Sequence, residues 1–412
     1  MEKKQLNICL MNDSFPPTID GVANCVLNYA EIINRKFGNV FVCTPHYPGV
    51  EDRYDFPVIR YPSVNLSHAF GYRAGLPFDV KTIRRLQQLP IDLIHVHCPI
   101  MSAVLARVLR ELIDKPIVLT YHTKFDVDIE KDISSKAMQE QAIRSIVSNI
   151  EACDEVWTVS KGAGENLRSL GFSGEYRVME NGVDFTRGCA SPEAVSAARA
   201  RYSLPEEIPV FLFVGRMMWY KGIRTILDGL ARLHAAKQPF RMLFIGDGAD
   251  KGEIVAYAQE LGLASVCQFL PPISDREELR TFYTLADLFL FPSDFDTNGL
   301  VVHEAAACGT ASLTLRGSCA AEGVTDLRNG LLIEPNAESL AAAVHQVIDD
   351  RALAVSLGEH AMSELYLSWE DSVTRAYERY NTVIDRYWTD RKERRGKSDT
   401  FFKTIAKLYK QS

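Results

Sequence analysis

The chain has 412 residues, of which 47% are apolar and 24% are charged, and its formal net charge is −7. This length exceeds what one ordinary hydrophobic core accommodates, so two domains are expected. The acidic balance argues against a general nucleic-acid-binding protein, and nine cysteines without a C-x-x-C pair are typical of free thiols in a reducing compartment.

Short apolar runs alternate with longer helical patterns along the whole chain. In the first half, strands are expected at residues 7–11, 40–45, 57–62, 92–97, 116–122 and 155–160. In the second half, strands are expected at residues 209–216, 241–248, 287–293 and 311–315. Continuous apolar strands separated by helices indicate parallel sheets that are covered on both faces. The sequence therefore predicts an α/β protein with two doubly wound domains.

The two halves meet in a polar stretch at residues 181–209, which contains glycine and proline and lacks a strong strand pattern. We therefore expect an N-terminal domain over residues 1–185 and a C-terminal domain over residues 186–368. Two such domains that face each other enclose a cleft, and ligands of these sheets bind beyond the carboxyl ends of the strands. The chemistry of the chain is therefore expected at its strand ends.

Three strand ends carry glycines and cations. Gly21 follows the first strand and opens a helix, where a ligand can approach the backbone, although glycine is equally common there for structural reasons. Arg216 and Lys221 flank one turn and can converge on a diphosphate. The alternative is two solvated surface cations. Gly246 lies in a G-D-G turn that lacks the full dinucleotide spacing, and we interpret it as bordering a nucleotide.

The strand end after residues 287–293 carries the strongest pattern. Asp296 lies in a polar turn, and a helix is expected to start at about residue 301. Backbone N–H groups available for sugar hydroxyls or phosphate come from Asn298, Gly299 and Leu300. Glu304 can accept two hydrogen bonds from a ribose diol. A carboxylate near a helix start also has a purely structural interpretation, which is its favourable interaction with the helix dipole.

Three histidines lie at or near strand ends. His122 ends an expected strand, and its imidazole can bond a sugar hydroxyl or polarise a leaving group, although a lone histidine is more often structural. His95 and His97 alternate along a strand and are expected to point to opposite faces, which argues against a shared metal site. The chain has no H-E-x-x-H motif and no paired aspartates, so no bound metal is expected.

Several segments, taken in their order and spacing, resemble the retaining GT-B glycosyltransferases of family 4. They are FPPTIDGVANCVLNYA, LTYHTKFD, VMENGVDF, FVGRMMWYKGI, FIGDG and PSDFDTNGLVVHEAAACG. The resemblance extends over roughly residues 5 to 385. It implies two Rossmann-like domains that face a central cleft, with a nucleotide-sugar held mainly by the C-terminal domain.

By this resemblance, Arg216 and Lys221 would bind the diphosphate and neutralise the leaving group, and Glu304 would hold the ribose. Gly21 would let the first loop approach the diphosphate. The anomeric configuration would be retained through a front-face mechanism, in which the donor phosphate helps to take the acceptor proton. No protein nucleophile is therefore expected.

The same resemblance implies that Asp296 and the amides of residues 298–300 hold the donor sugar, and that His122 contacts it from the N-terminal domain. The expected catalytic groups are therefore His122, Asp296, Arg216 and Lys221. The chain departs from the family pattern where Asp296 replaces a glutamate, Asn298 an aromatic residue and Asp20 a glycine. TYHTKFD together with DTNGLVVHEA looks most like the branch that glucosylates diacylglycerol.

The tail at residues 391–412 holds eight Lys and Arg against two acidic residues in an otherwise acidic chain. Its apolar residues fall on one helical face, namely Phe401, Phe402, Ile405, Leu408 and Tyr409. Lys403 and Lys407 lie toward the edge of that face. This pattern predicts a basic amphipathic helix on an anionic bilayer. The alternatives are a tail that packs on its own protein and a disordered tail.

Residues 369–390 are expected to form a helix, which in the family crosses back onto the N-terminal domain. The first apolar run is too short for a signal peptide, and no stretch approaches the length of a transmembrane helix. The expected location is therefore the cytoplasm, as a peripheral protein on the inner face of the cell membrane.

The predicted function is that of a hexosyltransferase that moves a hexose, glucose from UDP-glucose, onto a membrane lipid such as 1,2-diacylglycerol, without a metal or other cofactor. A soluble or polysaccharide acceptor is the first alternative. A nucleotide-sugar epimerase and a non-catalytic nucleotide-sugar binder are alternatives from other functional classes.

Overall fold

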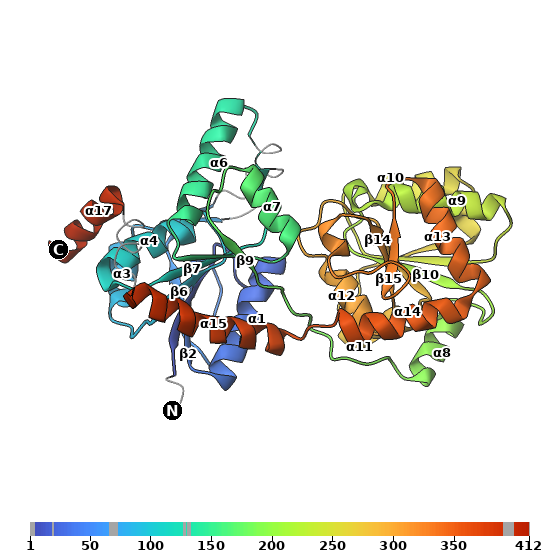
Figure 1. Ribbon diagram of the computed structural model, residues 1–412, viewed down its shortest axis with the longest axis horizontal. Coiled ribbons are helices and arrows are strands. Elements are labelled where there is room, and N and C mark those ends of the chain that lie inside the picture. Colours follow the sequence, from blue (N-terminus) through green and yellow to red (C-terminus); the bar gives the residue numbers. More distant parts are fainter. Residues whose placement is uncertain are drawn as a thin grey trace. The chain divides into compact units, whose positions relative to one another are not determined.

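The computed structural model describes residues 5–18, 20–65, 73–126, 129, 133–389 and 399–411. The chain forms two compact units (Figure 1). Unit 1 combines Met1–Asn181 with Trp369–Ser412, and unit 2 is Gly182–Ser368. The chain thus leaves unit 1 at the start of the polar stretch in which the sequence predicts the boundary, and it returns to unit 1 at Trp369.

Unit 1 contains a seven-stranded parallel sheet with the order β3-β2-β1-β6-β7-β8-β9. Its strands are β1 (Asn7–Met11), β2 (Asn39–Pro45), β3 (Val58–Tyr61), β6 (Leu93–Val96), β7 (Ile117–Tyr121), β8 (Glu155–Thr158) and β9 (Tyr176–Val178). The chain builds outward from β1 to β3 and then crosses to β6 on the other side of β1. This reversal is the signature of a doubly wound sheet. A separate antiparallel pair consists of β4 (Ser63–Asn65) and β5 (Arg73–Gly75).

Helices cover both faces of this sheet (Figure 1). They are α1 (Gly21–Lys36), α3 (Val80–Gln87), α4 (Met101–Ile113), α6 (Lys136–Glu151), α7 (Lys161–Ser169) and α15 (Trp369–Thr389). The last helix, α17 (Thr400–Gln411), packs against α4. Ile8 and Leu10 of β1 belong to the core cluster that includes α1 and α15. Cys9 and Met11 belong to the cluster that includes α3 and α4. Alternate side chains of one strand are thus buried on opposite faces, which explains the continuous apolar runs.

Unit 2 contains a six-stranded parallel sheet with the order β12-β11-β10-β13-β14-β15. Its strands are β10 (Val210–Val214), β11 (Arg241–Ile245), β12 (Cys267–Leu270), β13 (Leu288–Phe291), β14 (Ser312–Leu315) and β15 (Gly330–Ile333). Its helices are α8 (Pro192–Arg201), α9 (Ile223–Ala235), α10 (Lys251–Glu260), α11 (Arg276–Leu285), α12 (Leu300–Ala307), α13 (Ala337–Asp349) and α14 (Arg351–Glu364). Short 3₁₀ turns are η1 (Trp219–Lys221), η2 (Leu263–Ser265) and η3 (Cys319–Ala321). The α/β fold class predicted from the sequence is confirmed.

The strands that the sequence did not predict lie at the sheet edges or outside the main sheets. Each of the ten expected runs forms a strand, whereas β9, β12 and β15 were missed. These three strands occupy the outermost positions of their sheets. An edge strand is covered less completely, and the partly exposed residues of β9 and β12 interrupt the apolar run that marks an interior strand.

The apolar face of the tail helix α17, which the sequence assigned to a bilayer, is partly buried on unit 1 and partly exposed. Phe402 is buried in the core cluster of unit 1, and the guanidinium of Arg107 lies 4.0 Å from its ring centroid. The Tyr409 hydroxyl donates to the backbone carbonyl of Phe78 at 2.6 Å. Phe401 and Leu408, in contrast, are 57% and 62% exposed. The prediction that the whole face is free for a membrane is therefore wrong for Phe402, because α4 offers it a buried contact, and Ile405 and Tyr409 also pack against this core cluster. Residues 391–398 of the tail lie outside the described residues.

A membrane span is not found among the helices in the described ranges, because none of them is both long and apolar enough.

Replacing Phe402 by Ala should release α17 from unit 1. Loss of a buried aromatic side chain costs about 3 kcal/mol, so hydrogen exchange of the α17 amides should accelerate about 100-fold while β1 stays protected. Phe401→Ala is the matched control, because Phe401 is largely exposed and its removal should change little. Equal exchange rates in both variants would contradict the packing described for α17.

Candidate active site

The strand order of unit 2 reverses at β10, and the predicted donor-site residues gather there. The chain builds β10, β11 and β12 toward one edge and then crosses to β13 on the other side of β10. The loops that follow β10, β11 and β13 therefore lie next to one another at the carboxyl edge of the sheet. Ligands of open α/β sheets bind at such a reversal, because the helices on the two sides diverge and leave a crevice.

Lys221 and Asp296 form an ion pair at this reversal. Lys221 is buried at the end of η1, and its Nζ lies 2.5 Å from Oδ1 of Asp296. The hydroxyl of Ser293 donates to the other carboxylate oxygen at 2.6 Å. The loops after β10 and β13 are thereby joined by two of the residues predicted from sequence. A lysine ammonium has three N–H donors, so this ion pair leaves donors for an anionic ligand.

Arg216 is exposed and follows Gly215 directly after β10. Its guanidinium makes no ion pair with any residue in the described part of the chain. Gly246, after β11, has a structural explanation: a Cβ at this position would lie 1.9 Å from the carbonyl oxygen of Gly215. Close packing of two strand ends therefore suffices to require glycine there, and contact of Gly246 with a nucleotide stays a prediction.

The N-terminus of α12 presents unused donors. Gly299 adopts a φ of +64° and precedes Leu300, the first residue of the helix, without a side chain that caps it. The Nδ2 atom of the Asn298 side chain is buried and has no hydrogen-bond partner among the residues that the structure describes. Backbone N–H groups at a helix start carry partial positive charge and favour anions and hydroxyl oxygens. The replacement of an aromatic residue by Asn298 thus adds a polar group to this helix start.

Glu304 lies in α12, and both of its oxygens have partners. Oε2 accepts a hydrogen bond from the Tyr283 hydroxyl at 3.0 Å, and Oε1 lies 3.4 Å from Nη1 of Arg276. Burial raises the pKa of the Glu304 carboxyl, and the charge of Arg276 counteracts this shift. The sequence did not point to Arg276, because this residue follows the edge strand β12, which was itself missed. Each carboxylate oxygen can accept a second hydrogen bond, so a ribose diol remains compatible with these contacts.

In unit 1, Gly21 and Asp20 lie at the start of α1. Asp20 caps the helix, because its Oδ1 accepts hydrogen bonds from the backbone N–H groups of Val22 at 2.8 Å and Ala23 at 2.7 Å. The departure from the family glycine at this position therefore has a structural reason. A Cβ at Gly21 would meet no atom within 4 Å, so the packing described for unit 1 does not require this glycine.

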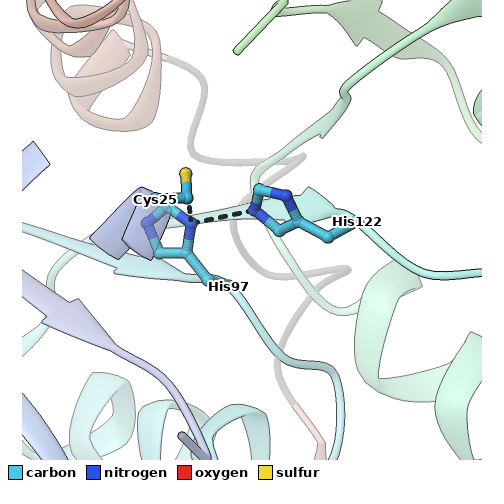
Figure 2. A group of neighbouring side chains, drawn as sticks. All are labelled: Cys25, His97 and His122. Carbon is cyan, nitrogen blue, oxygen red and sulfur yellow. Dashed lines mark hydrogen bonds between the residues drawn. The ribbon is translucent and has the colours of Figure 1, made fainter. Parts of the chain in front are cut away.

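His122 and His97 lie at the carboxyl ends of the adjacent strands β7 and β6. The Nε2 atom of His122 is 3.0 Å from Nδ1 of His97, and the Cys25 thiol of α1 lies 4.0 Å from the same nitrogen (Figure 2). All three residues are buried. Burial lowers the pKa of His122 to about 3, and it also lowers the pKa of His97, so both rings are neutral near pH 7.

The expectation that His95 and His97 point to opposite faces is wrong. Their ring centroids are 4.0 Å apart, and both rings contact Tyr29 edge to face. Alternation holds within a strand, but β6 ends at Val96, and His97 belongs to the turn that follows. His97 was consequently overlooked as a neighbour of His122. Potential ligand atoms of Cys25, His97 and His122 all lie within 4.8 Å of one another, so the argument from alternation does not exclude a metal there.

Two glycosyltransferase family models match the chain, one in each half. The family model described as Glycosyl transferases group 1 matches residues 195–364, and the model described as Glycosyltransferase Family 4 matches residues 19–187. Alpha-monoglucosyldiacylglycerol synthase of Streptococcus pneumoniae is 23% identical, over 98% of this chain and 93% of the relative. D-inositol 3-phosphate glycosyltransferase of a Nocardioides species is 29% identical, over 70% of this chain and 67% of the relative.

The fold is also found in a solved structure. The Anabaena protein HepE in complex with UDP-glucose superposes with a TM-score of 0.69 over 92% of this chain and 99% of HepE, at 19% sequence identity. At this identity the likeness shows the fold.

The lowered pKa of His122 predicts a loss of stability in acid. The unfolded imidazole takes up a proton near pH 6.5, whereas the folded ring stays neutral until about pH 3. The contribution of neutral His122 to the free energy of unfolding is therefore complete above pH 7. It falls by about 2 kcal/mol between pH 7 and pH 5. Urea unfolding of wild type and His122→Asn at these two pH values measures it. The variant should lose that much less stability than wild type, and identical losses would refute the buried neutral state.

Proposed function

We propose that this chain, which belongs to the GT-B glycosyltransferases of family 4 and is a hexosyltransferase, moves glucose from UDP-glucose to a membrane lipid such as 1,2-diacylglycerol, with retention of the anomeric configuration. The observation that carries the donor part is the convergence of Lys221, Asp296 and the α12 N-terminus at the reversal of the sheet. The acceptor part rests on the similarity to a diacylglycerol-glucosylating relative and on the tail helix.

Arg216 and Lys221 stabilise the leaving diphosphate. Negative charge develops on this group as the glycosidic bond breaks, and cations already held in place lower the energy of that state without reorganisation. Mg²⁺ commonly supplies such charge in phosphoryl transfer. The cationic side chains of Arg216 and Lys221 can supply this positive charge, so we propose that transfer needs no metal. Asp296 then exchanges part of its contact with Lys221 for a hydroxyl of the donor sugar, and Glu304 holds the ribose.

The acceptor is reached at a membrane surface on which the enzyme is peripheral, at the inner face of the cell membrane. Phe401 and Leu408 expose apolar area on one flank of α17, and Lys403 and Lys407 lie on the other flank. Exposed apolar side chains and basic residues on the same helix favour shallow adsorption on anionic lipids. Packing of Phe402 on unit 1 supports this role, because it keeps the helix folded before it meets the bilayer.

A soluble acceptor is the second candidate, and the similarity to D-inositol 3-phosphate glycosyltransferase favours keeping it. Incubation of the purified chain with UDP-glucose and either lipid vesicles that contain diacylglycerol or soluble polyols distinguishes the two by mass spectrometry of the products. An epimerase would convert the donor without any acceptor. A non-catalytic binder would yield no product with any donor.

Removing the buried cation should impair transfer. Lys221→Met keeps the side-chain length but removes the charge, and kcat should fall by about 10²–10³-fold, the usual effect of losing one preorganised group in such a site. Lys237→Met is the matched control, because Lys237 is exposed just beyond the C-cap of α9. A rate within twofold of wild type in Lys221→Met, with thermal stability unchanged, would rule out the diphosphate role.

Charge placed on the exposed flank of α17 should weaken membrane binding. The double variant Phe401→Glu with Leu408→Glu adds two negative charges, each worth about 1 kcal/mol near an anionic bilayer, so affinity for phosphatidylglycerol vesicles should drop about 30-fold. The double variant Val355→Glu with Leu327→Glu is the control, since these side chains are 64% and 59% exposed on unit 2. Vesicle cosedimentation that is the same for both variants would remove α17 as the membrane contact.

A further inference from the structure

The hydrogen bond between His97 and His122 contains one proton, and either ring nitrogen could be its donor. Both rings are buried, and neither is bonded to a carboxylate of the residues that the structure describes, so each ring is neutral and carries a single N–H. The 3.0 Å separation of Nδ1 of His97 from Nε2 of His122 fits one nitrogen that donates and one that accepts (Figure 2). The side that donates determines which nitrogen of His122 bears its own proton.

The surroundings of His97 decide the direction. The Cys25 thiol donates to Oδ1 of Asn181 at 3.6 Å, so its sulfur lone pairs are left to face Nδ1 of His97 at 4.0 Å. This nitrogen therefore has two acceptors around it, the sulfur and Nε2 of His122, which favours a proton on Nδ1. In the reverse arrangement the proton of His97 would sit on Nε2, which is buried and has no partner among the described residues. An unpaired buried N–H group is the rarer and costlier outcome.

We propose that His97 is a positioning residue that donates from Nδ1 to Nε2 of His122 and thereby fixes His122 with its proton on Nδ1. His122 then presents a neutral N–H donor, for which no partner exists in the described part of unit 1. Its ligand is an oxygen that accepts a hydrogen bond, either a sugar hydroxyl or a phosphate oxygen of the donor. The inference rests on the proposed function for that contact. It also excludes His122 as a general base through Nδ1, because this nitrogen has no free lone pair.

Side chains that mimic one imidazole nitrogen at a time test the contact with substrate. The amide nitrogen of Asn is as many bonds from Cβ as Nδ1 of histidine, and that of Gln as many as Nε2. His122→Asn should therefore exceed His122→Gln in kcat/KM by about tenfold, the effect of one hydrogen bond. His97→Asn, which keeps a donor toward His122, should exceed His97→Leu by a similar factor.

Histidine ring nitrogen NMR of the full-length chain reads the proton position without reference to activity. We expect an Nδ1–H signal for His122 in wild type and in His97→Asn, and an increased Nε2–H population in His97→Leu. An Nε2–H signal for His122 in wild type overturns the proposal. Zinc bound at one equivalent and lost in Cys25→Ser also overturns it, because a metal would replace the shared proton. If the Nδ1–H signal is present but His122→Asn and His122→Gln are equally active, the role of His122 in the proposed function fails instead.

Discussion

Parallel pairing throughout both main sheets is the constraint from which the placement of the site follows. When every strand of a sheet runs in one direction, each strand-to-helix turn emerges at the same edge, whatever its distance along the chain. Arg216, Gly246 and Asp296 come from three different loops, yet β10 brings these loops together because it pairs with both β11 and β13. The same constraint places His97 and His122 beside each other at the ends of β6 and β7.

Parallel pairing also explains which strands and which candidate site residues could be predicted from the sequence. Interior strands are buried on both faces, so their apolar runs were visible, and the residues that follow them could be selected as candidates. The edge strand β12 lacked such a run, and Arg276, which follows it, was missed together with its contact to Glu304. His97 was misplaced for a different reason: β6 ends at Val96, one residue earlier than expected, so the strand alternation does not extend to His97.

The residue types of the predicted donor site did not reveal how its charged side chains pair with one another. Lys221 and Asp296 were assigned to different parts of the donor, and in the structure they neutralise each other. Glu304 similarly has Arg276 and Tyr283 as partners. A buried charge without a partner is costly, so a site built for a charged ligand is stable without that ligand only if its own charges are paired. Such pairs form between loops that are distant in sequence, and a pattern along the chain therefore does not reveal them.

The tail shows why packing on the protein and adsorption on a membrane are not exclusive. A free amphipathic segment loses conformational entropy when it folds on a bilayer, which offsets part of the gain from apolar burial. In α17 the ring of Phe402 under Arg107 and the hydroxyl bond of Tyr409 hold the helix in place beforehand. Phe401 and Leu408 are then exposed on a helix that is already ordered, so a bilayer would bind them at a low cost in conformational entropy. A helix anchored by one flank thus leaves its other flank available to lipid, and the membrane binding that we propose would gain from Phe402 remaining in the protein core.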